Sequence, residues 1–431
     1  MASEPPDRNG SGTTGATRLG GTFTRFWTGS LSSNLADGIM LTALPMVAAM
    51  LTNDPLLVSG LTVARFLPWL LVGLFVGVVV DRLDRARVMV VGNALRCMAL
   101  VALAVAVASG SASVWVLYAV MFTVMLCEVF YDVSVRAMLP DVVPTGALDR
   151  ANARMVGGRT VTEDFAGAPL AGFLFAVTAA VPLAVNAGAY LLSALVLLGL
   201  PLAVRRPRRD EHAAMGEGGV VGSAAAEMGE GLRFVWGDRP LLSLVLFLAF
   251  ANMALMAQTS VIVLLVRDHF GVPESLYGVF MSSSAVGGVL GAVVVGRIVR
   301  VLGRFRTEVL SFGVMAGMCV VFGLSPNAVT ASLAWGAIAF AITVANVVGI
   351  GVSQLVVPGS LLGRVASCMK MISTGTSPLG AVLGGFLGRV DLRLPSLAAG
   401  GMVVLGLLLA APWLRSLVER ADEAERAGAV E

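Results

Sequence analysis

Twelve long apolar runs, separated by short polar turns, dominate this sequence of 431 residues. A helix needs about 20 apolar residues to cross a bilayer, and each run has roughly that length. Hydrophobic residues make up 57% of the chain and charged residues only 13%, which is too little polar surface to cover a soluble protein of this size. The runs predict an all-α polytopic membrane protein with twelve transmembrane helices, at residues 25–50, 56–80, 88–109, 113–137, 160–178, 181–204, 240–265, 274–299, 307–325, 328–356, 368–388 and 395–414.

The placement of the basic residues predicts the orientation of these helices. Loops rich in Arg and Lys remain in the cytoplasm. If both termini are cytoplasmic, the inner loops and ends hold 25 of the 30 basic residues, and the outer loops hold only Arg267, Arg389 and Arg393. The opposite orientation would invert this ratio. We therefore expect a multi-pass protein of the cell (plasma) membrane with both termini in the cytoplasm.

Three short motifs recur in the same order in the two halves of the chain, at offsets of 209 to 215 residues. Internal repeats of this kind are common in secondary transporters, and three matches in order predict two pseudo-symmetric six-helix halves. The matching pairs are Val78-Val-Val-Asp81-Arg82 with Val293-Val-Val-Gly296-Arg297, Val143-Pro144 with Val357-Pro358, and Pro169-Leu170 with Pro378-Leu379.

The repeat and the polar segments together divide the chain. We expect an N-terminal half at 23–204 and a C-terminal half at 240–415, joined by a cytoplasmic loop at 205–239. Residues 1–22 are polar, lack the apolar centre of a signal peptide, and are expected to form a disordered cytoplasmic tail. A second cytoplasmic tail is expected at 416–431.

A cluster of charge ends the apolar run 56–80. Its pattern, Gly77-x-x-x-Asp81-Arg82-x-x-Arg85, resembles the loop 2–3 signature of the major facilitator superfamily. The resemblance implies a cytoplasmic gate that latches the two halves while the protein faces outward, with Gly77 allowing close approach of helices. The second copy has Gly296 in place of Asp81, so we expect a gate on one side only.

Other stretches are similar to the bacterial efflux group that includes the macrolide exporters and the enterobactin exporter. The resemblance covers roughly residues 23–415 and implies the twelve-helix major facilitator fold. Its motifs are Ser33-Asn34-Leu-Ala-Asp37-Gly38, Leu67-Pro68-Trp69-Leu-Leu, Leu148-x-Arg-Ala-Asn152-Ala-Arg154 and Gly363-Arg364-Val-Ala.

Two acidic residues fall inside predicted membrane helices. Asp37 lies near the middle of the first helix, with Asn34 on the same face, and Glu128 lies just past the middle of the fourth. A charge in a membrane is costly unless it is paired or hydrated, so both acids are candidates for proton binding or substrate contact, together with Asn34 and Arg65. The alternative is a permanent ion pair of one acid with Arg65 or Arg96.

Further residues extend the predicted gate and the packing. Asp132 and Arg136 are four residues apart near the cytoplasmic end of the fourth helix, and a pair at this spacing shares one helix face. We expect them to form an ion pair in the cytoplasmic gate. Gly167, Pro169 and Gly172 resemble the glycine–proline motif of helix five in antiporters but fall short of the full pattern, and helix packing alone is the favoured explanation.

The favoured function is efflux of a hydrophobic or amphipathic small molecule, a drug or natural product, by proton antiport and alternating access. A siderophore exporter, a proton-coupled nutrient importer and a non-transporting receptor or scaffold remain as alternatives. The sequence contains no nucleotide-binding motif and no nucleophile–base set, so an enzyme is not expected.

The expected partners are a small-molecule substrate, protons and membrane lipid. We expect a monomer that binds no nucleic acid, metal or cofactor. The four cysteines and two histidines show no spacing typical of a metal site.

Overall fold

The computed structural model describes residues 19–73, 75–201, 220–359 and 361–428. Within these ranges the side chains of Val78, Asp81, Thr145, Asp164 and 220–228 lie outside the description. All regular secondary structure in the described residues is helical. The predicted tail 1–22 is described only at 19–22.

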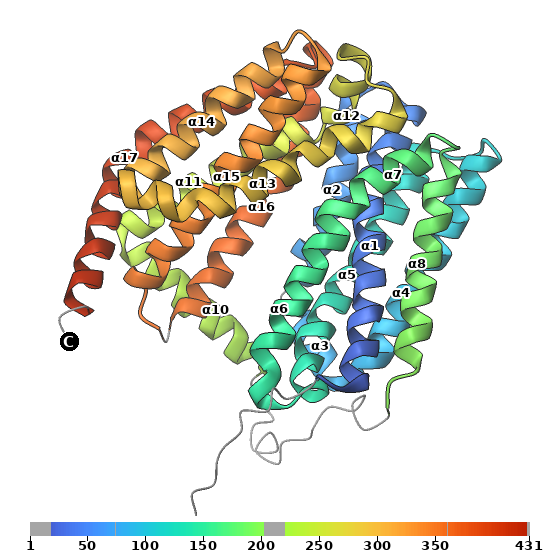
Figure 1. Cartoon of the computed structure of the whole chain (residues 1–431), viewed down its shortest axis with the longest axis horizontal. Coiled ribbons are helices and arrows are strands. Elements are labelled where there is room, and N and C mark those ends of the chain that lie inside the picture. Colours follow the sequence, from blue (N-terminus) through green and yellow to red (C-terminus); the bar gives the residue numbers. More distant parts are fainter. Residues whose placement is uncertain (1–18, 74, 202–219, 360, 429–431) are drawn as a thin grey trace, which may run out of the picture.

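The N-terminal half consists of helices that lie side by side (Figure 1). These are α1 (Gly20–Leu51), α2 (Pro55–Val72), α3 (Val76–Arg82), α4 (Arg85–Ala108), α5 (Val114–Val142), η1 (Thr145–Ala147), α6 (Leu148–Arg159), the π-helical η2 (Thr160–Ala166), α7 (Gly167–Phe175) and α8 (Ala180–Leu198).

The C-terminal half repeats this arrangement after a connecting helix. Its elements are α10 (Val220–Gly237), α11 (Arg239–Thr259), α12 (Ile262–Leu264), η4 (Leu265–His269), α13 (Glu274–Leu302), α14 (Arg304–Leu324), α15 (Ala328–Val356), α16 (Leu362–Val390) and α17 (Leu394–Gly428). The helix α10 lies in the segment 205–239, packs on α16 and forms the ion pair Glu230–Arg364. The last helix, α17, continues through most of the segment 416–431.

Polar residues at the turns explain where several helices begin. Asp54 accepts a hydrogen bond from the backbone N–H of Leu56 at 3.0 Å, with Pro55 in the first helical position of α2. Asp84, Ser113, Asp238 and Asn327 cap α4, α5, α11 and α15 in the same way. Such caps satisfy N–H groups that have no partner within the helix.

Ten helices among the described residues are long and apolar enough to cross a membrane. The other two predicted spans are also largely helical: η2 and α7 cover 160–175 of the span 160–178, and 368–388 lies within α16. The prediction of one continuous helix at 56–80 is wrong, because the chain divides into α2 and α3 at Gly73. Pro68 removes a helical hydrogen bond one turn earlier, and glycine is a poor helix former.

The two halves meet at one end of the bundle and diverge toward the opposite end, where α1 begins and α17 ends, which we name the terminal end (Figure 1). Helix α2 packs on α16, and α7 packs on α13. Close packing requires glycine: a β-carbon at Gly278 of α13 would lie 2.8 Å from the backbone carbonyl carbon of Ala168, and one at Gly385 of α16 would lie 2.9 Å from the Cα of Leu56.

Polar contacts also join the halves at this closed end. Arg389 forms a bidentate pair with Asp54, with Nε 2.7 Å from Oδ1 and Nη2 2.5 Å from Oδ2. Arg267 donates to Asn53 at 2.7 Å and to the carbonyl of Ala49. We name the Asp54–Arg389 pair the outer latch. The hydrogen bonds from Arg389 hold the pKa of Asp54 below its ordinary value.

Candidate functional site: a charged cavity between the halves

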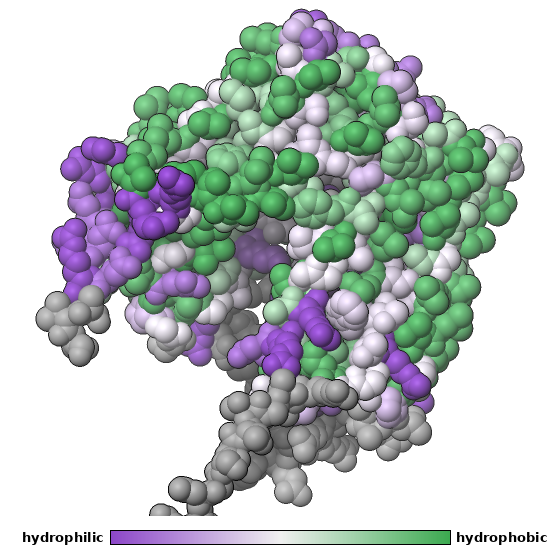
Figure 2. Space-filling model, viewed as in Figure 1, coloured by the Kyte–Doolittle hydropathy of each residue, from purple (hydrophilic) through white to green (hydrophobic). Residues whose placement is uncertain are grey.

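A cavity of about 560 Å³ lies between the halves, where they diverge. Figure 2 shows a hollow between the halves on the terminal side, while apolar side chains cover much of the visible outer face. The cavity wall combines apolar side chains with charges of both signs. Its charged residues are Asp37, Arg65, Glu128, Asp132, Arg136, Arg159, Glu163 and Lys370, and its larger apolar residues include Met40, Leu41, Phe66, Trp69, Leu70, Met125 and Met371.

One arginine contacts both predicted membrane acids. Arg96 of α4 is fully buried and forms an ion pair with Glu128 Oε2 of α5 through Nη2. Its Nη1 lies 3.8 Å from Asp37 Oδ1 of α1, which also accepts a hydrogen bond from the hydroxyl of Tyr190 at 2.5 Å. The second oxygen of Asp37, Oδ2, has no hydrogen-bond partner among the described residues. Two carboxylates therefore share one cation at the cavity wall.

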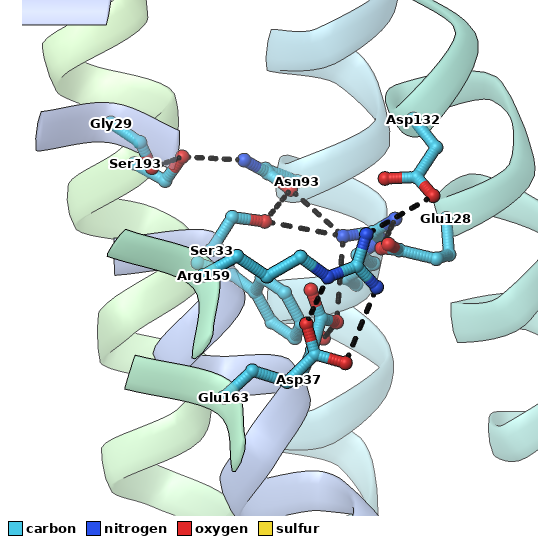
Figure 3. A network of polar contacts seen from close by, with 11 residues as sticks. Gly29, Ser33, Asp37, Asn93, Glu128, Asp132, Arg159, Glu163 and Ser193 are labelled. Carbon is cyan, nitrogen blue, oxygen red and sulfur yellow. Dashed lines mark hydrogen bonds and ion pairs between the residues drawn. The ribbon is translucent and has the colours of Figure 1, made fainter. Parts of the chain in front are cut away.

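A chain of hydrogen bonds behind this set fixes the position of Arg96 (Figure 3). Nη1 of Arg96 lies within 3.3 Å of Ser33 Oγ and 3.4 Å of Asn93 Oδ1. Asn93 donates to Ser193 at 2.7 Å, and Ser193 donates to the carbonyl of Gly29 at 2.7 Å. Helices α1, α4 and α8 are thus joined by polar contacts, which offset part of the cost of burying a charge.

A second arginine contacts another pair of acids nearby (Figure 3). Arg159, at the end of α6, places Nη1 3.5 Å from Asp132 Oδ2 and Nε 2.6 Å from Glu163 Oε2. The predicted Asp132–Arg136 ion pair is therefore wrong, because Asp132 pairs with Arg159. Although Asp132 and Arg136 are on the same helix, α6 and η2 bring a cation closer from another segment. Arg136 is exposed and lines the cavity.

The comparisons with known proteins agree with this architecture. A family model described as Major Facilitator Superfamily matches residues 26–360. The chain belongs to the major facilitator superfamily. The MFS-type transporter YfiS of Bacillus subtilis (strain 168) is 26% identical over 385 residues, covering 86% of this chain and 88% of YfiS. The multidrug efflux pump Tap of Mycolicibacterium fortuitum is 27% identical over 397 residues, covering 89% and 91%.

Solved structures of transporters share the fold of this facilitator at low sequence identity. A mutant form of the nucleoside transporter NupG matches with a TM-score of 0.71 and 13% identity, over 91% of this chain and 99% of NupG. A bacterial homologue of the iron transporter ferroportin in an inward-facing state matches with a TM-score of 0.67 and 16% identity, over 91% and 98%. These similarities concern the fold alone.

The loop signature of this major facilitator lies at the diverging end, where its α3 segment packs on α5. A β-carbon at Gly77 would meet no described atom within 4 Å, so the expected close helix approach at Gly77 does not occur in this conformation, in which the halves diverge at that end. Arg82 is exposed, and Arg85 donates to Asp141 at 3.0 Å and to the carbonyl of Ala137. Asp81 is the second-to-last residue of α3, and its side chain lies outside the described part.

The glycine–proline motif of the facilitator packs between two helices. A β-carbon at Gly167 would lie 2.5 Å from Cα of Gly38 in α1, and one at Gly172 would lie 2.8 Å from the backbone nitrogen of Gly278 in α13. Pro169 lies on α7 between these two contacts. Helix packing therefore accounts for the spacing of these small residues.

The remaining predicted residues differ in their relation to the cavity. Arg65 lines it, with Cζ 5.2 Å from the ring centroid of Phe66. Asn34 is buried in α1 but does not contribute to the cavity wall. Sequence reasoning missed Tyr190 and Arg159, because Asp37 and Asp132, the acids that they contact, lie on other helices. The only sequence signal for these two residues was that each is a polar side chain within or beside an apolar run.

Proposed function

We propose that this facilitator exports a hydrophobic or amphipathic small molecule by proton antiport, with the terminal end in the cytoplasm. The observation that carries the proposal is the sharing of Arg96 between Asp37 and Glu128 at the wall of the cavity. The cavity is the substrate site, and the shared arginine is the coupling element.

The charge balance of this set supports proton coupling. With both acids ionised, one cation faces two carboxylates, so the set keeps one excess negative charge. Two unit charges about 4 Å apart interact by about 4 kcal/mol at an effective dielectric constant of about 20. A proton bound at the unpartnered Oδ2 of Asp37 removes the excess charge and weakens the hold of Arg96 on α1. Binding and release of that proton would then alter the packing of α1 against α4.

Two sequence features favour export driven by a gradient. In the predicted topology the inner loops and tails hold 25 of the 30 basic residues, which predicts that the terminal end is cytoplasmic. The cavity lies on that side. The sequence carries no nucleotide-binding motif that would supply energy from ATP. The relative Tap, named a multidrug efflux pump, is consistent with this direction.

Transport into everted membrane vesicles tests the proposal. Vesicles from cells that produce the protein are given an acid-inside gradient and offered fluorescein, Nile red and rhodamine 123 in turn. We expect uptake of at least one dye, loss of uptake when the gradient is collapsed, and loss of gradient-driven uptake in Asp37→Asn and Glu128→Gln. Glu274→Gln is the matched control, because Glu274 is an exposed acid at the start of α13.

Two results would contradict the proposal. If both acid variants accumulate dye as the unaltered protein does under the imposed gradient, these acids do not couple protons to transport. If dye accumulates only in right-side-out vesicles, the protein is an importer, which is the competing function.

A further inference from the structure

Three basic side chains of the cavity wall, Arg65, Arg136 and Lys370, form no ion pair among the described residues, and Arg65 is the only one of the three that is partly buried. Lys370 of α16 and Arg136 of α5 both line the cavity and are exposed, and neither forms an ion pair within that part of the chain. They come from opposite halves of the protein, so a ligand between them would contact both halves. Lys370 is also the only lysine in the sequence.

The acids of the cavity wall, in contrast, are already engaged. Asp37 and Glu128 contact Arg96, and Asp132 and Glu163 contact Arg159. A cationic ligand would have to compete with an arginine for these carboxylates, and displacing that arginine would leave a buried or half-buried guanidinium without its partner. The one oxygen without a hydrogen-bond partner, Oδ2 of Asp37, is itself buried. Even with all four acids ionised, the basic residues of the region exceed them by one, since it contains Arg65, Arg96, Arg136, Arg159 and Lys370.

Aromatic and thioether groups lie beside the unpaired cations. Nζ of Lys370 lies 5.7 Å from the ring centroid of Trp69 in α2. Met125 and Met371 also line the cavity, and methionine side chains adapt to ligands of different shape. A flat apolar ligand body could therefore pack on Trp69 while its charged group reaches Lys370.

We propose that the substrate is an anionic amphipath, with its acidic group held by Lys370 and Arg136 and its apolar part packed against Trp69 and the methionines. This inference rests on the proposed function only in taking the cavity as the substrate site. It narrows the substrate class from hydrophobic or amphipathic molecules to those with a carboxylate, sulfonate, phosphate or phenolate group. Charged hydrogen bonds to such groups are among the stronger polar contacts in proteins.

Equilibrium binding of two dyes tests the charge preference. Fluorescein and rhodamine 123 share a xanthene ring system but carry opposite charge at neutral pH. The full-length protein is placed in phosphatidylcholine nanodiscs, which carry no net lipid charge, and dye binding is followed by fluorescence anisotropy against empty nanodiscs. Because no gradient is applied, the measurement is independent of proton coupling and of transport direction.

The expected result is saturable binding of fluorescein that rhodamine 123 does not displace. Lys370→Met and Arg136→Gln should each weaken fluorescein binding about tenfold, as expected for loss of one charged contact, and Lys370→Arg should retain it. Arg306→Gln is the matched control, because Arg306 is exposed near the terminal end and does not line the cavity.

Three outcomes would overturn the inference: tighter binding of rhodamine 123 than of fluorescein, unchanged fluorescein binding in both cavity variants, or no saturable binding of fluorescein. Fluorescein binding without gradient-driven uptake would instead refute only the proton-coupled function. Gradient-driven uptake of rhodamine 123 without fluorescein binding would refute only the substrate class.

Discussion

Arg96 is expected to be the most sensitive charged position for folding. It is fully buried, and its two partners, Asp37 and Glu128, are 4% and 8% exposed. Arg96→Met keeps a long side chain but leaves two buried carboxylates without their cation. Removing one partner of a buried ion pair costs about 3–5 kcal/mol, which agrees with about 4 kcal/mol for charges 3.8 Å apart at an effective dielectric constant of about 20.

This cost is a large share of the net stability of a protein, which is about 5–15 kcal/mol. An unfolding entropy of about 2.1 cal/mol/K per residue amounts to about 0.9 kcal/mol/K for a chain of 431 residues, so we expect Arg96→Met to lower the melting temperature by about 3–6 °C. The assay is thermal unfolding of the full-length protein in nanodiscs, followed by the intrinsic fluorescence of its six tryptophans. The triple variant Arg96→Met/Asp37→Asn/Glu128→Gln should recover most of the loss, because it contains no unpaired charge at this site.

A matched control separates the effect of removing a buried arginine from the effect of removing an arginine at any position. Arg300 of α13 is exposed, and its Nε donates to the carbonyl of Gly296 in the same helix; Arg300→Met should change the melting temperature very little. The reasoning is refuted if Arg96→Met melts like the unaltered protein. It is also refuted if the triple variant is no more stable than the single one, since unpaired buried charge would then not be the cause.

Three further predictions concern the closed end. Arg389→Gln removes the outer latch to Asp54, and we expect the population with this end open to rise by at most about fivefold. The measurement is pulsed electron–electron double resonance between spin labels at Ser111 and Val329, in a variant without native cysteines. An unchanged distance distribution would contradict this prediction. The outer latch requires ionised Asp54, whose pKa is lowered, so the latch persists above the ordinary pKa of aspartate and weakens as the pH falls through the lowered pKa. The distances between the two labels should therefore be constant from about pH 8 to about pH 5 and lengthen only below about pH 4. Gly278→Val would press a side chain onto the backbone of α7 and should open this end or lower the melting temperature; a variant with normal distances and stability would argue against close packing there.

Much of the fold followed from the sequence alone. Apolar runs of about 20 residues predict membrane helices because a bilayer offers no water to unsatisfied backbone groups, and the repeats at half the chain length predict two related halves. The structure and the family match confirm a polytopic all-α major facilitator. The break between α2 and α3 was missed because hydropathy does not report a local loss of helical hydrogen bonds.

The acids at Asp37 and Glu128 were also identifiable, because charge inside an apolar run is rare and costly. Their pairing was not. Arg96 was one of two candidate partners, and only the packing of α1, α4 and α5 shows that it contacts both acids. Helical spacing in the sequence predicted Arg136 as the partner of Asp132, whereas in the structure Arg159 of α6 forms the ion pair with Asp132.

The sequence by itself therefore determined which segments cross the membrane, how they repeat and which charges lie at membrane depth, because these depend on local composition and solvent. Only the tertiary structure decided which charges are paired and which remain for a ligand. Lys370 and Arg136 lie far apart in the chain and are ordinary basic residues by composition. They line one cavity because two separate halves are held together at the other end by glycine packing and the outer latch.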